Sequence, residues 1–119
     1  MEILVVEEDL PRLEAVQEFL RVHGHRVTAA CDGERAVDLL GSRVFDLVIS
    51  DVRLPGVDGF TLFRRLRREA PSTRVILLTG YGTVPDAVAA IKEGAVEYLT
   101  KPFDHGDLLK AVGQIAEKK

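Results

Sequence analysis

Apolar runs of strand length alternate with segments of helical periodicity along the whole chain. The strand-like runs are residues 2–6, 26–30, 44–50, 74–79 and 96–100. The segments with apolar residues at helical spacing are residues 10–23, 34–42, 57–68, 84–93 and 105–117. Short apolar runs are typical of strands buried in a sheet, and apolar residues at i, i+3, i+4 and i+7 are typical of amphipathic helices. The pattern therefore predicts five successive units of a strand followed by a helix.

These units predict an α/β protein built on one parallel sheet. The first, third and fourth runs are near-continuous Ile, Leu and Val, as expected of interior strands, whereas the second and fifth are shorter and more mixed, which suits edges. Right-handed crossovers between such strands favour the flavodoxin-like (βα)5 fold, a five-stranded parallel sheet of order 2-1-3-4-5 with helices on both faces. At 119 residues and without a linker or repeat, the chain is expected to form a single domain, residues 1–119.

Local signals mark where several helices begin and end. Three aspartates stand at expected N-cap positions: Asp9, Asp32 and Asp104. Three glycines follow expected helix ends, where a left-handed residue is favoured: Gly24, Gly41 and Gly94. Asp58 lies in the VDG segment, and we interpret it as a turn or cap residue. The apolar helix faces are predicted to consist of Leu13, Val16 and Leu20; Val84, Val88 and Ile91; and Leu108, Val112 and Ile115.

Charge and hydropathy argue against several classes of function. The net charge of −3 gives no reason to expect this domain to bind nucleic acid. No apolar stretch approaches the twenty or so residues of a membrane span. The chain starts MEILVV without a basic segment, so we interpret this run as a first strand rather than a signal peptide and expect a cytoplasmic protein.

Reactive polar groups follow four of the strand-like runs. They are Glu7 and Glu8, Asp51, Thr79 and Lys101. In an open parallel sheet the carboxyl ends of the strands converge on one crevice, so these side chains are expected to meet there. Taken singly, an Asp after a strand is usually a cap, a Thr a strand former and a Lys near a chain end a solvated residue. Together, carboxylates beside a lysine and a hydroxyl are suited to a divalent cation and a phosphoryl group.

Asp51 is the best candidate for a nucleophile. It follows a buried run, and the turn residues Pro55, Gly56 and Gly59 in the next segment, VRLPGVDG, are expected to leave its carboxylate facing outward. A carboxylate attacks phosphorus only if its own charge and that of the phosphoryl oxygens are offset. The neighbouring polar groups are suited to provide that offset.

The offset is expected from Mg²⁺ and from two further side chains. Glu7 and Glu8 are predicted to hold the metal with the nucleophile and the backbone carbonyl of Arg53, directly or through water, because Mg²⁺ prefers octahedral oxygen ligands and keeps several waters. Lys101 is a point charge for one phosphoryl oxygen, and the Thr79 hydroxyl is suited to donate to another. A phosphoryl group adds roughly −1.5 to −2 charge, enough to pull a hydroxyl and its loop into a new position.

Four motifs carry a resemblance to a known family. In order, they are ILVVEED, LVISDVRLPGVDGF, VILLTGYG and EYLTKPFD. With them the chain resembles, from end to end, the receiver domain of bacterial two-component response regulators. The resemblance implies that Asp51 accepts a phosphoryl group from a phosphohistidine on a sensor histidine kinase, that Mg²⁺ is required, and that Thr79 and Lys101 contact the acyl phosphate. It implies a regulatory domain rather than an enzyme, one that catalyses its own phosphorylation and slow autodephosphorylation and regulates an output domain or partner.

The resemblance also implies a switch and an assembly. Tyr98 is implied as a switch aromatic that swings inward as Thr79 moves, and Lys101–Pro102 is implied as a cis peptide. The stretch from Thr79 to Asp104 is similar to receivers of the nitrogen-regulation type, in which a receiver precedes an ATPase and a DNA-binding domain that regulates transcription. Such receivers change their pairing as homodimers through the fourth helix, fifth strand and fifth helix. In this chain that face is expected to include Val84, Val88, Ala95, Tyr98 and Phe103.

One departure from the family pattern leaves a second function open. The acidic pair is usually Asp-Asp or Glu-Asp, whereas this chain has Glu7-Glu8, and the longer Glu8 carries its carboxylate roughly 1.5 Å further out. Three outcomes are open: Glu8 ligates Mg²⁺ through another rotamer, binds it only through water, or reaches Lys101 in an ion pair that mimics activation. The alternative function is a pseudo-receiver, a constitutive protein-interaction module with an altered metal site.

A third class, an aspartyl-phosphate phosphatase or a flavin carrier on the same fold, fits the residues less well. A phosphatase needs a second acid two residues after its nucleophile, and Arg53 stands there. The acids after the first strand would repel a flavin phosphate.

Overall fold

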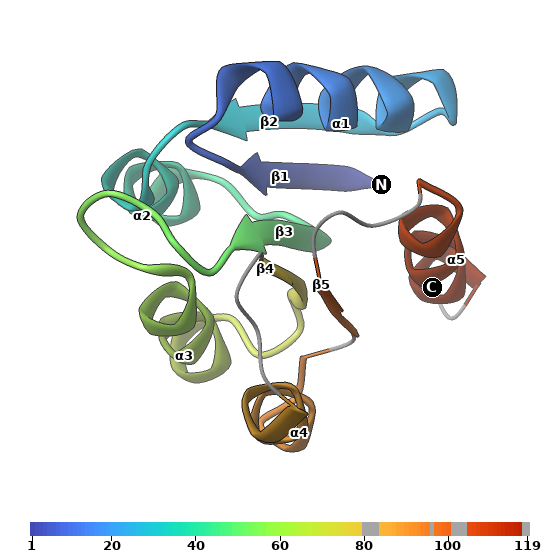
Figure 1. The fold of residues 1–119 in the computed structure, drawn as a ribbon. Helices are drawn as coiled ribbons and strands as arrows, with labels where there is room; N and C mark the ends of the chain where they lie inside the picture. Colours follow the sequence, from blue (N-terminus) through green and yellow to red (C-terminus); the bar gives the residue numbers. More distant parts are fainter. Residues whose placement is uncertain (80–83, 96, 101–104, 118–119) are drawn as a thin grey trace.

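The computed structural model, which describes residues 1–79, 84–95, 97–100 and 105–117, shows strands and helices in strict alternation (Figure 1). The strands are β1 (Glu2–Val6), β2 (Arg26–Ala30), β3 (Leu47–Asp51), β4 (Arg74–Thr79) and β5 (Glu97–Thr100). The helices are α1 (Leu10–Val22), α2 (Gly33–Ser42), α3 (Gly59–Glu69), α4 (Val84–Lys92) and α5 (His105–Glu117). The predicted alternation is confirmed. Within these ranges, each helix is too short or too polar to cross a lipid bilayer.

The sheet is parallel throughout and has the predicted order β2-β1-β3-β4-β5. The interior strands β1, β3 and β4 are almost entirely buried, which accounts for their unbroken Ile, Leu and Val. β2, at one edge, is only partly buried and has the more mixed sequence RVTAA. The assignment of interior and edge strands from composition is therefore confirmed.

The third strand begins later than its apolar run. β3 starts at Leu47 rather than at residue 44, so the predicted boundary was wrong by three residues. Val44 is 88% exposed and lies in the preceding loop, whereas Phe45 is buried in the core. The run combines a loop residue, a core anchor and a strand, and apolar character alone does not separate these.

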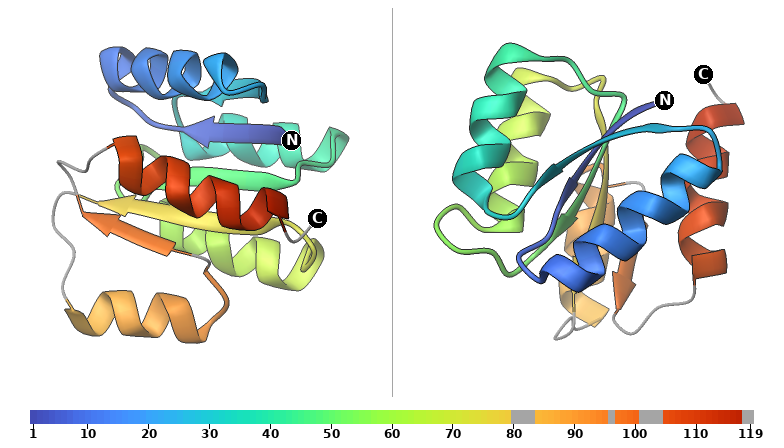
Figure 2. Two further views of the ribbon diagram at one scale, coloured as in Figure 1. Left: turned by 90° about the vertical axis from the view of Figure 1, so that its right-hand side faces the viewer. Right: turned by 90° about the horizontal axis from the view of Figure 1, so that it is seen from above.

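Helices cover both faces of the sheet (Figure 2). α1 and α5 lie on one face, where the predicted apolar faces of both helices are buried. The residues involved are Leu13, Val16, Leu20, Leu108, Val112 and Ile115. α2, α3 and α4 pack on the other face, around Phe45 and Phe63. The sheet is thus the middle of three layers, and its ends are left to the connecting loops.

α4 departs from the predicted pattern. Val88 and Ile91, placed on its apolar face by their spacing, are 47% and 46% exposed. Ala90 is the buried residue among the described side chains of this helix, residues 88–92. A small residue, rather than the large apolar ones, therefore meets the core.

Two of the predicted N-caps are confirmed. Asp32 and Asp58 each accept a hydrogen bond from the backbone N–H three residues later, at 2.7 and 2.9 Å. Asp9 precedes α1 but makes no such bond, because its carboxylate is paired with Arg12 at 3.2 Å. Asp104 lies outside the described residues.

Two of the three glycines end helices as predicted. Gly24 and Gly94 have φ angles of 89° and 109°, the left-handed conformation that glycine adopts without steric cost. Gly41 was predicted wrongly, because α2 continues through it to Ser42. The helix ends at Ser42, and the extended backbone of Arg43 leads into the loop before β3.

Candidate functional site

The strand order brings three of the predicted site residues to one edge of the sheet. Glu7 directly follows β1, Asp51 ends β3 and Thr79 ends β4. β1 and β3 are neighbours with Val6 opposite Ser50, so Glu7 and Asp51 come next on strands that lie about 4.8 Å apart. β4 pairs with the other side of β3, so Thr79 stands on the third of three consecutive strands.

Glu7, Asp51 and Thr79 are buried, with only 3%, 7% and 2% of their surfaces exposed. Val5 and Ile49, two residues before the two acids, pack in the same core cluster. The alternation of side chains along a strand therefore directs both acids to the same face. Carboxylates held close together away from water oppose each other's ionisation, and a bound cation relieves this opposition.

Glu8 does not share this environment. It is exposed, and it lies beyond the end of β1, where the chain bends toward α1. In the part of the chain that the structure describes, no three His, Cys, Asp or Glu side chains are grouped so that they could hold a metal ion. The predicted set of Glu7, Glu8 and Asp51 is thus not assembled as three carboxylates. Glu7 and Asp51 remain the acids whose placement suits direct contact with a cation.

The loop from β3 to α3 covers Asp51. The Arg53 N–H donates to Asp51 Oδ1 at 3.2 Å, and the Val52 N–H donates to the Leu78 carbonyl at 2.8 Å. The sequence-based expectation of an outward-facing carboxylate was wrong in this respect, since the loop folds back over the strand end. The same fold places the Arg53 backbone, predicted to supply a metal ligand, next to the nucleophile.

Two contacts at Asp51 were not anticipated from the sequence. The buried Ser50 hydroxyl donates to the Asp51 carbonyl at 2.9 Å. At Gly59 a Cβ would lie 2.3 Å from the same carbonyl oxygen and 2.7 Å from Val52 Cα, so only glycine lets α3 begin there. In the sequence, these contacts are marked only by a serine inside an apolar run and a glycine at the start of a helix. Without the fold, neither residue shows that it contacts Asp51.

Tyr98 lies on the edge strand next to β4. It is partly buried against the α2–α3 side of the core, and its ring stacks near Phe60 with 6.4 Å between centroids. Ala95, which was assigned to the exposed pairing face, is 6% exposed and belongs to the core, so that assignment was wrong. Val88 is exposed as that face requires, whereas the Val84 side chain lies outside the described part.

Several predicted residues fall outside the described residues. These are Lys101, Pro102 with the peptide bond joining them, and Phe103. β5 ends at Thr100, which lies opposite Thr79 on β4. The predicted roles of Lys101, of the cis peptide and of Phe103 remain predictions.

The donor set fits Mg²⁺. Glu7 and Asp51 offer hard carboxylate oxygens, and the adjacent Arg53 backbone offers a carbonyl, which are the ligand types that Mg²⁺ prefers. Two carboxylates and a carbonyl leave room for the waters that this ion retains. Asp51 is also the kind of group that attacks phosphorus once its charge is offset.

A cavity of about 220 Å³ lies away from this edge. It is lined by residues of α2, α3 and the loops that precede β3 and β4, including Val44, Arg65 and Thr73. None of the predicted site residues that lie in the described part of the chain lines it. The chemistry at the strand ends, rather than the size of the hollow, therefore identifies the candidate site.

The chain is similar to known proteins over most of its length. A model of the response regulator receiver domain matches residues 3–113. The response regulator protein FleR of Pseudomonas aeruginosa is 41% identical over 114 residues, which are 96% of this chain and 24% of FleR. The transcriptional regulatory protein ZraR of Escherichia coli O157:H7 is 38% identical over 108 residues, which are 91% of this chain and 24% of ZraR. The chain thus spans about a quarter of the length of these two relatives.

A solved structure has the same architecture. The signal receiver domain of an HD domain-containing protein from Pseudomonas fluorescens Pf-5 is 41% identical, with a TM-score of 0.89. The similarity covers 98% of this chain and 94% of that chain.

Proposed function

The chain belongs to the response regulator receiver domain family, and from this premise we propose that it is a switch controlled by phosphorylation of Asp51. One observation carries the proposal. Asp51 and Glu7 are buried on adjacent strands at the carboxyl edge of the sheet, and Thr79 ends the next strand. This arrangement combines a nucleophile, an acid suited to a cation and a hydroxyl that can respond to a new anion.

The proposed reaction transfers a phosphoryl group from a phosphohistidine of a sensor histidine kinase. A carboxylate oxygen of Asp51 attacks phosphorus, the P–N bond breaks, and its electron pair stays on the imidazole nitrogen. Mg²⁺, when bound, offsets the charge on the phosphoryl oxygens and the acids. Glu7, Asp51 and the Arg53 carbonyl would hold the cation, with Glu8 acting through water. Slow attack of water on the acyl phosphate returns Asp51 to its carboxylate.

Two residues read the modified state in this proposal. The Thr79 hydroxyl donates to one phosphoryl oxygen and Lys101 places its charge against another. The movement of Thr79 frees space that Tyr98 occupies, and the shift passes to α4 and β5. These roles rest on the family membership and on the position of Thr79 at the end of β4.

The wider setting is part of the proposal. The relatives include regulators of the nitrogen-regulation type, and they are about four times as long as this chain. We therefore propose a cytoplasmic location for this chain, a sensor histidine kinase as donor and an output domain that regulates transcription as target. Pairing with a second copy through α4, β5 and α5 is proposed to change on phosphorylation. Solution scattering with and without a phosphoryl mimic tests the pairing, and identical profiles would remove it.

The geometry does not support the alternative of a constitutive pseudo-receiver. That alternative requires that Glu7 and Glu8 no longer bind a metal ion usefully. Glu7 is buried beside Asp51, and only Glu8 is turned to solvent. No observation therefore favours it over the active switch.

Mass spectrometry after incubation with acetyl phosphate tests the proposed function. The expected result is a gain of one phosphoryl group that requires Mg²⁺ and is lost in Asp51→Asn. Asp46→Asn is the matched control, because Asp46 lies just before the other end of the same strand. A gain that persists in Asp51→Asn, or no gain in the unmodified chain, would contradict the proposal.

A further inference from the structure

Helix α2 presses against the loop that joins β3 to α3. Gly33, the first residue of α2, is buried, and its N–H donates to the Pro55 carbonyl at 3.4 Å. A Cβ at Gly33 would lie 1.9 Å from the Val57 carbonyl oxygen and 2.8 Å from Val57 Cβ. Non-bonded atoms settle at about 3.5–4.0 Å, so any side chain here would displace the loop by roughly 1 Å or more.

Both ends of this loop are fixed. Val52 is bonded to β4 at 2.8 Å, and the Asp58 side chain accepts the first-turn N–H of α3 at 2.9 Å. Because both ends are held, a displacement of Val57 must move the loop residues between Val52 and Asp58. Arg53 is one of them, and its N–H contacts Asp51 Oδ1 at 3.2 Å.

Gly33 and Gly59, each at the start of a helix, are the two glycines of the described part at which an added Cβ would come within 3 Å of another atom. At Gly41 in α2 and at Gly113 in α5, an added Cβ would meet no atom within 4 Å. Gly56, at the tip of the loop, has a φ of 75° and faces the Glu34 side chain of α2, whose Oε1 would lie 3.3 Å from an added Cβ. Helix and loop thus contact each other at two points, and glycine makes both possible.

We propose that Gly33 is a positioning residue for the acidic pocket. Its bare first turn lets α2 hold the loop where the Arg53 carbonyl and the Asp51 carboxylate have the spacing that Mg²⁺ requires. The inference rests on the proposed function and adds a support that lies outside the strand ends. Mg²⁺ tolerates little departure from octahedral geometry, and a 1 Å misplacement of a site group can cost about a hundredfold in rate.

The test compares Mg²⁺ affinity between alanine variants. Gly33→Ala is expected to weaken Mg²⁺ binding, measured by calorimetry without phosphodonor, by about tenfold or more. Gly41→Ala in the same helix is the matched control and should remain within about twofold. Gly56→Ala strains the same loop, because Gly56 has the left-handed conformation that alanine rarely adopts, and should weaken binding several-fold.

A second control separates positioning from lost stability. Val16 is buried against the α1–α5 face, so Val16→Ala lowers the free energy of unfolding without touching the loop. It should leave Mg²⁺ affinity unchanged. If Val16→Ala weakens Mg²⁺ binding as much as Gly33→Ala, or if Gly33→Ala binds Mg²⁺ as the unmodified chain does, the proposal is overturned. Should Gly33→Ala fail to fold, Gly56→Ala decides alone.

Amide hydrogen exchange distinguishes failure of this inference from failure of the proposed function. In the absence of metal, the Arg53 amide is expected to exchange at least about tenfold faster in Gly33→Ala than in Gly41→Ala, because its bond to Asp51 is loosened. Unchanged exchange would overturn the positioning role even if the unmodified chain takes up phosphoryl groups. Faster exchange in a chain that binds no Mg²⁺ would retain the positioning role and overturn the proposed function.

Discussion

The three interior strands carry the same type of polar residue at both ends, and the two ends use it differently. The pairs are Glu2 and Glu7 around β1, Asp46 and Asp51 around β3, and Thr73 and Thr79 around β4. At the amino edge the first members bond to other parts of the fold. At the carboxyl edge the second members gather in the candidate site. Residue type alone therefore does not distinguish the candidate site from the opposite edge of the sheet, whereas position along the strand does.

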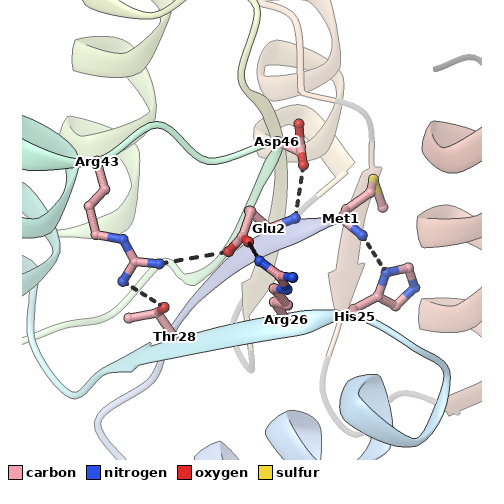
Figure 3. Close-up of polar contacts among 7 residues, drawn as sticks. All are labelled: Met1, Glu2, His25, Arg26, Thr28, Arg43 and Asp46. Atoms are coloured by element: carbon pink, nitrogen blue, oxygen red, sulfur yellow. Dashed lines mark hydrogen bonds and ion pairs between the residues drawn. The ribbon is translucent and has the colours of Figure 1, made fainter.

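The amino edge is a neutralised surface network (Figure 3). Glu2 pairs with Arg26 at 3.3 Å and Arg43 at 3.7 Å, and Arg43 also donates to Thr28 at 3.0 Å. Asp46 accepts the Glu2 backbone N–H at 2.8 Å. These groups are partly exposed, and such pairs contribute about 0–1 kcal/mol each. Their charges are already matched, so this edge creates little demand for a ligand.

The carboxyl edge brings negative charges together instead. Glu7 and Asp51 are buried on adjacent strands, which makes a cation favourable there. In this topology the helices also start at this edge, as α3 does at Gly59 close to Asp51, and helix N-termini favour anions such as a phosphoryl group. The carboxyl edge is thus suited to both a cation and an anion. The amino edge, where the charges are already paired, is suited to neither.

The glutamate pair gives the largest expected difference. Glu7→Gln should weaken Mg²⁺ binding by about tenfold or more, because one of two buried ligand charges is lost. Glu2→Gln should leave Mg²⁺ binding unchanged and lower the free energy of unfolding by less than about 1 kcal/mol. Calorimetric titration and urea denaturation measure the two quantities. Equal Mg²⁺ affinities for the two variants would remove the contrast between the edges.

The threonine pair should separate stability from signalling. The buried Thr73 hydroxyl donates to the Phe45 carbonyl at 2.9 Å, so Thr73→Val should cost about 1–3 kcal/mol of unfolding free energy and leave phosphoryl uptake intact. Thr79→Val should retain uptake but lose the accompanying shift in the amide spectrum around Tyr98. A full spectral response in Thr79→Val would show that the hydroxyl does not read the phosphoryl group.

Glu8→Asp sharpens the description of the carboxyl edge itself. The shorter side chain should raise Mg²⁺ affinity several-fold, because an aspartate fits the compact octahedral shell better than the solvent-directed glutamate. Titration with Mg²⁺ measures the change. Unchanged affinity would mean that the second acid takes no part in binding the metal.

His25 gives the smallest expected effect, at the amino edge. Burial first, then the charges of the Met1 α-ammonium and His23, lower the pKa of His25 below its usual 6.5. The unfolded chain then binds a proton more readily, so the His25 contribution is retained above about pH 6.5 and is lost as the pH falls through the lowered pKa. Because the ring is partly solvated and screened, the loss should be below about 1 kcal/mol. Urea denaturation at pH 7.5 and 5 measures the fall in the free energy of unfolding between the two pH values. This fall should be smaller in His25→Asn than in the unmodified chain.

The fold could be predicted because its signals are local and repeated. Unbroken apolar strands and amphipathic α1 and α5 give the layer order, and Asp32, Asp58, Gly24 and Gly94 act on neighbours a few residues away. The predictions for Asp9 and Gly41 were wrong because other local interactions prevailed. Asp9 forms an ion pair with Arg12, and α2 continues through Gly41, and neither outcome follows from the residue type alone.

The site could be predicted only as a set of strand ends. That Glu7 and Asp51 are neighbours follows from strand order. The bond from the Arg53 N–H to Asp51 depends on how the adjacent loop turns, and the contact of Gly33 with Val57 depends on packing between segments more than twenty residues apart in sequence. Val88 and Ile91 were predicted to face the core but are half-exposed. Helical spacing shows that apolar residues share one face of a helix, but it does not show whether that face meets the core.

The way α4 is seated has a mechanical consequence. Among side chains 88–92 only Ala90 is fully withdrawn from water, whereas Val88 and Ile91 are 47% and 46% exposed. Because hydrophobic stabilisation scales with the apolar area buried, sliding or tilting this half of the helix sacrifices less free energy than the same movement of α1, where Leu13, Val16 and Leu20 are all buried. A free-energy change of a few kcal/mol at a neighbouring strand end is therefore enough to shift this half of α4.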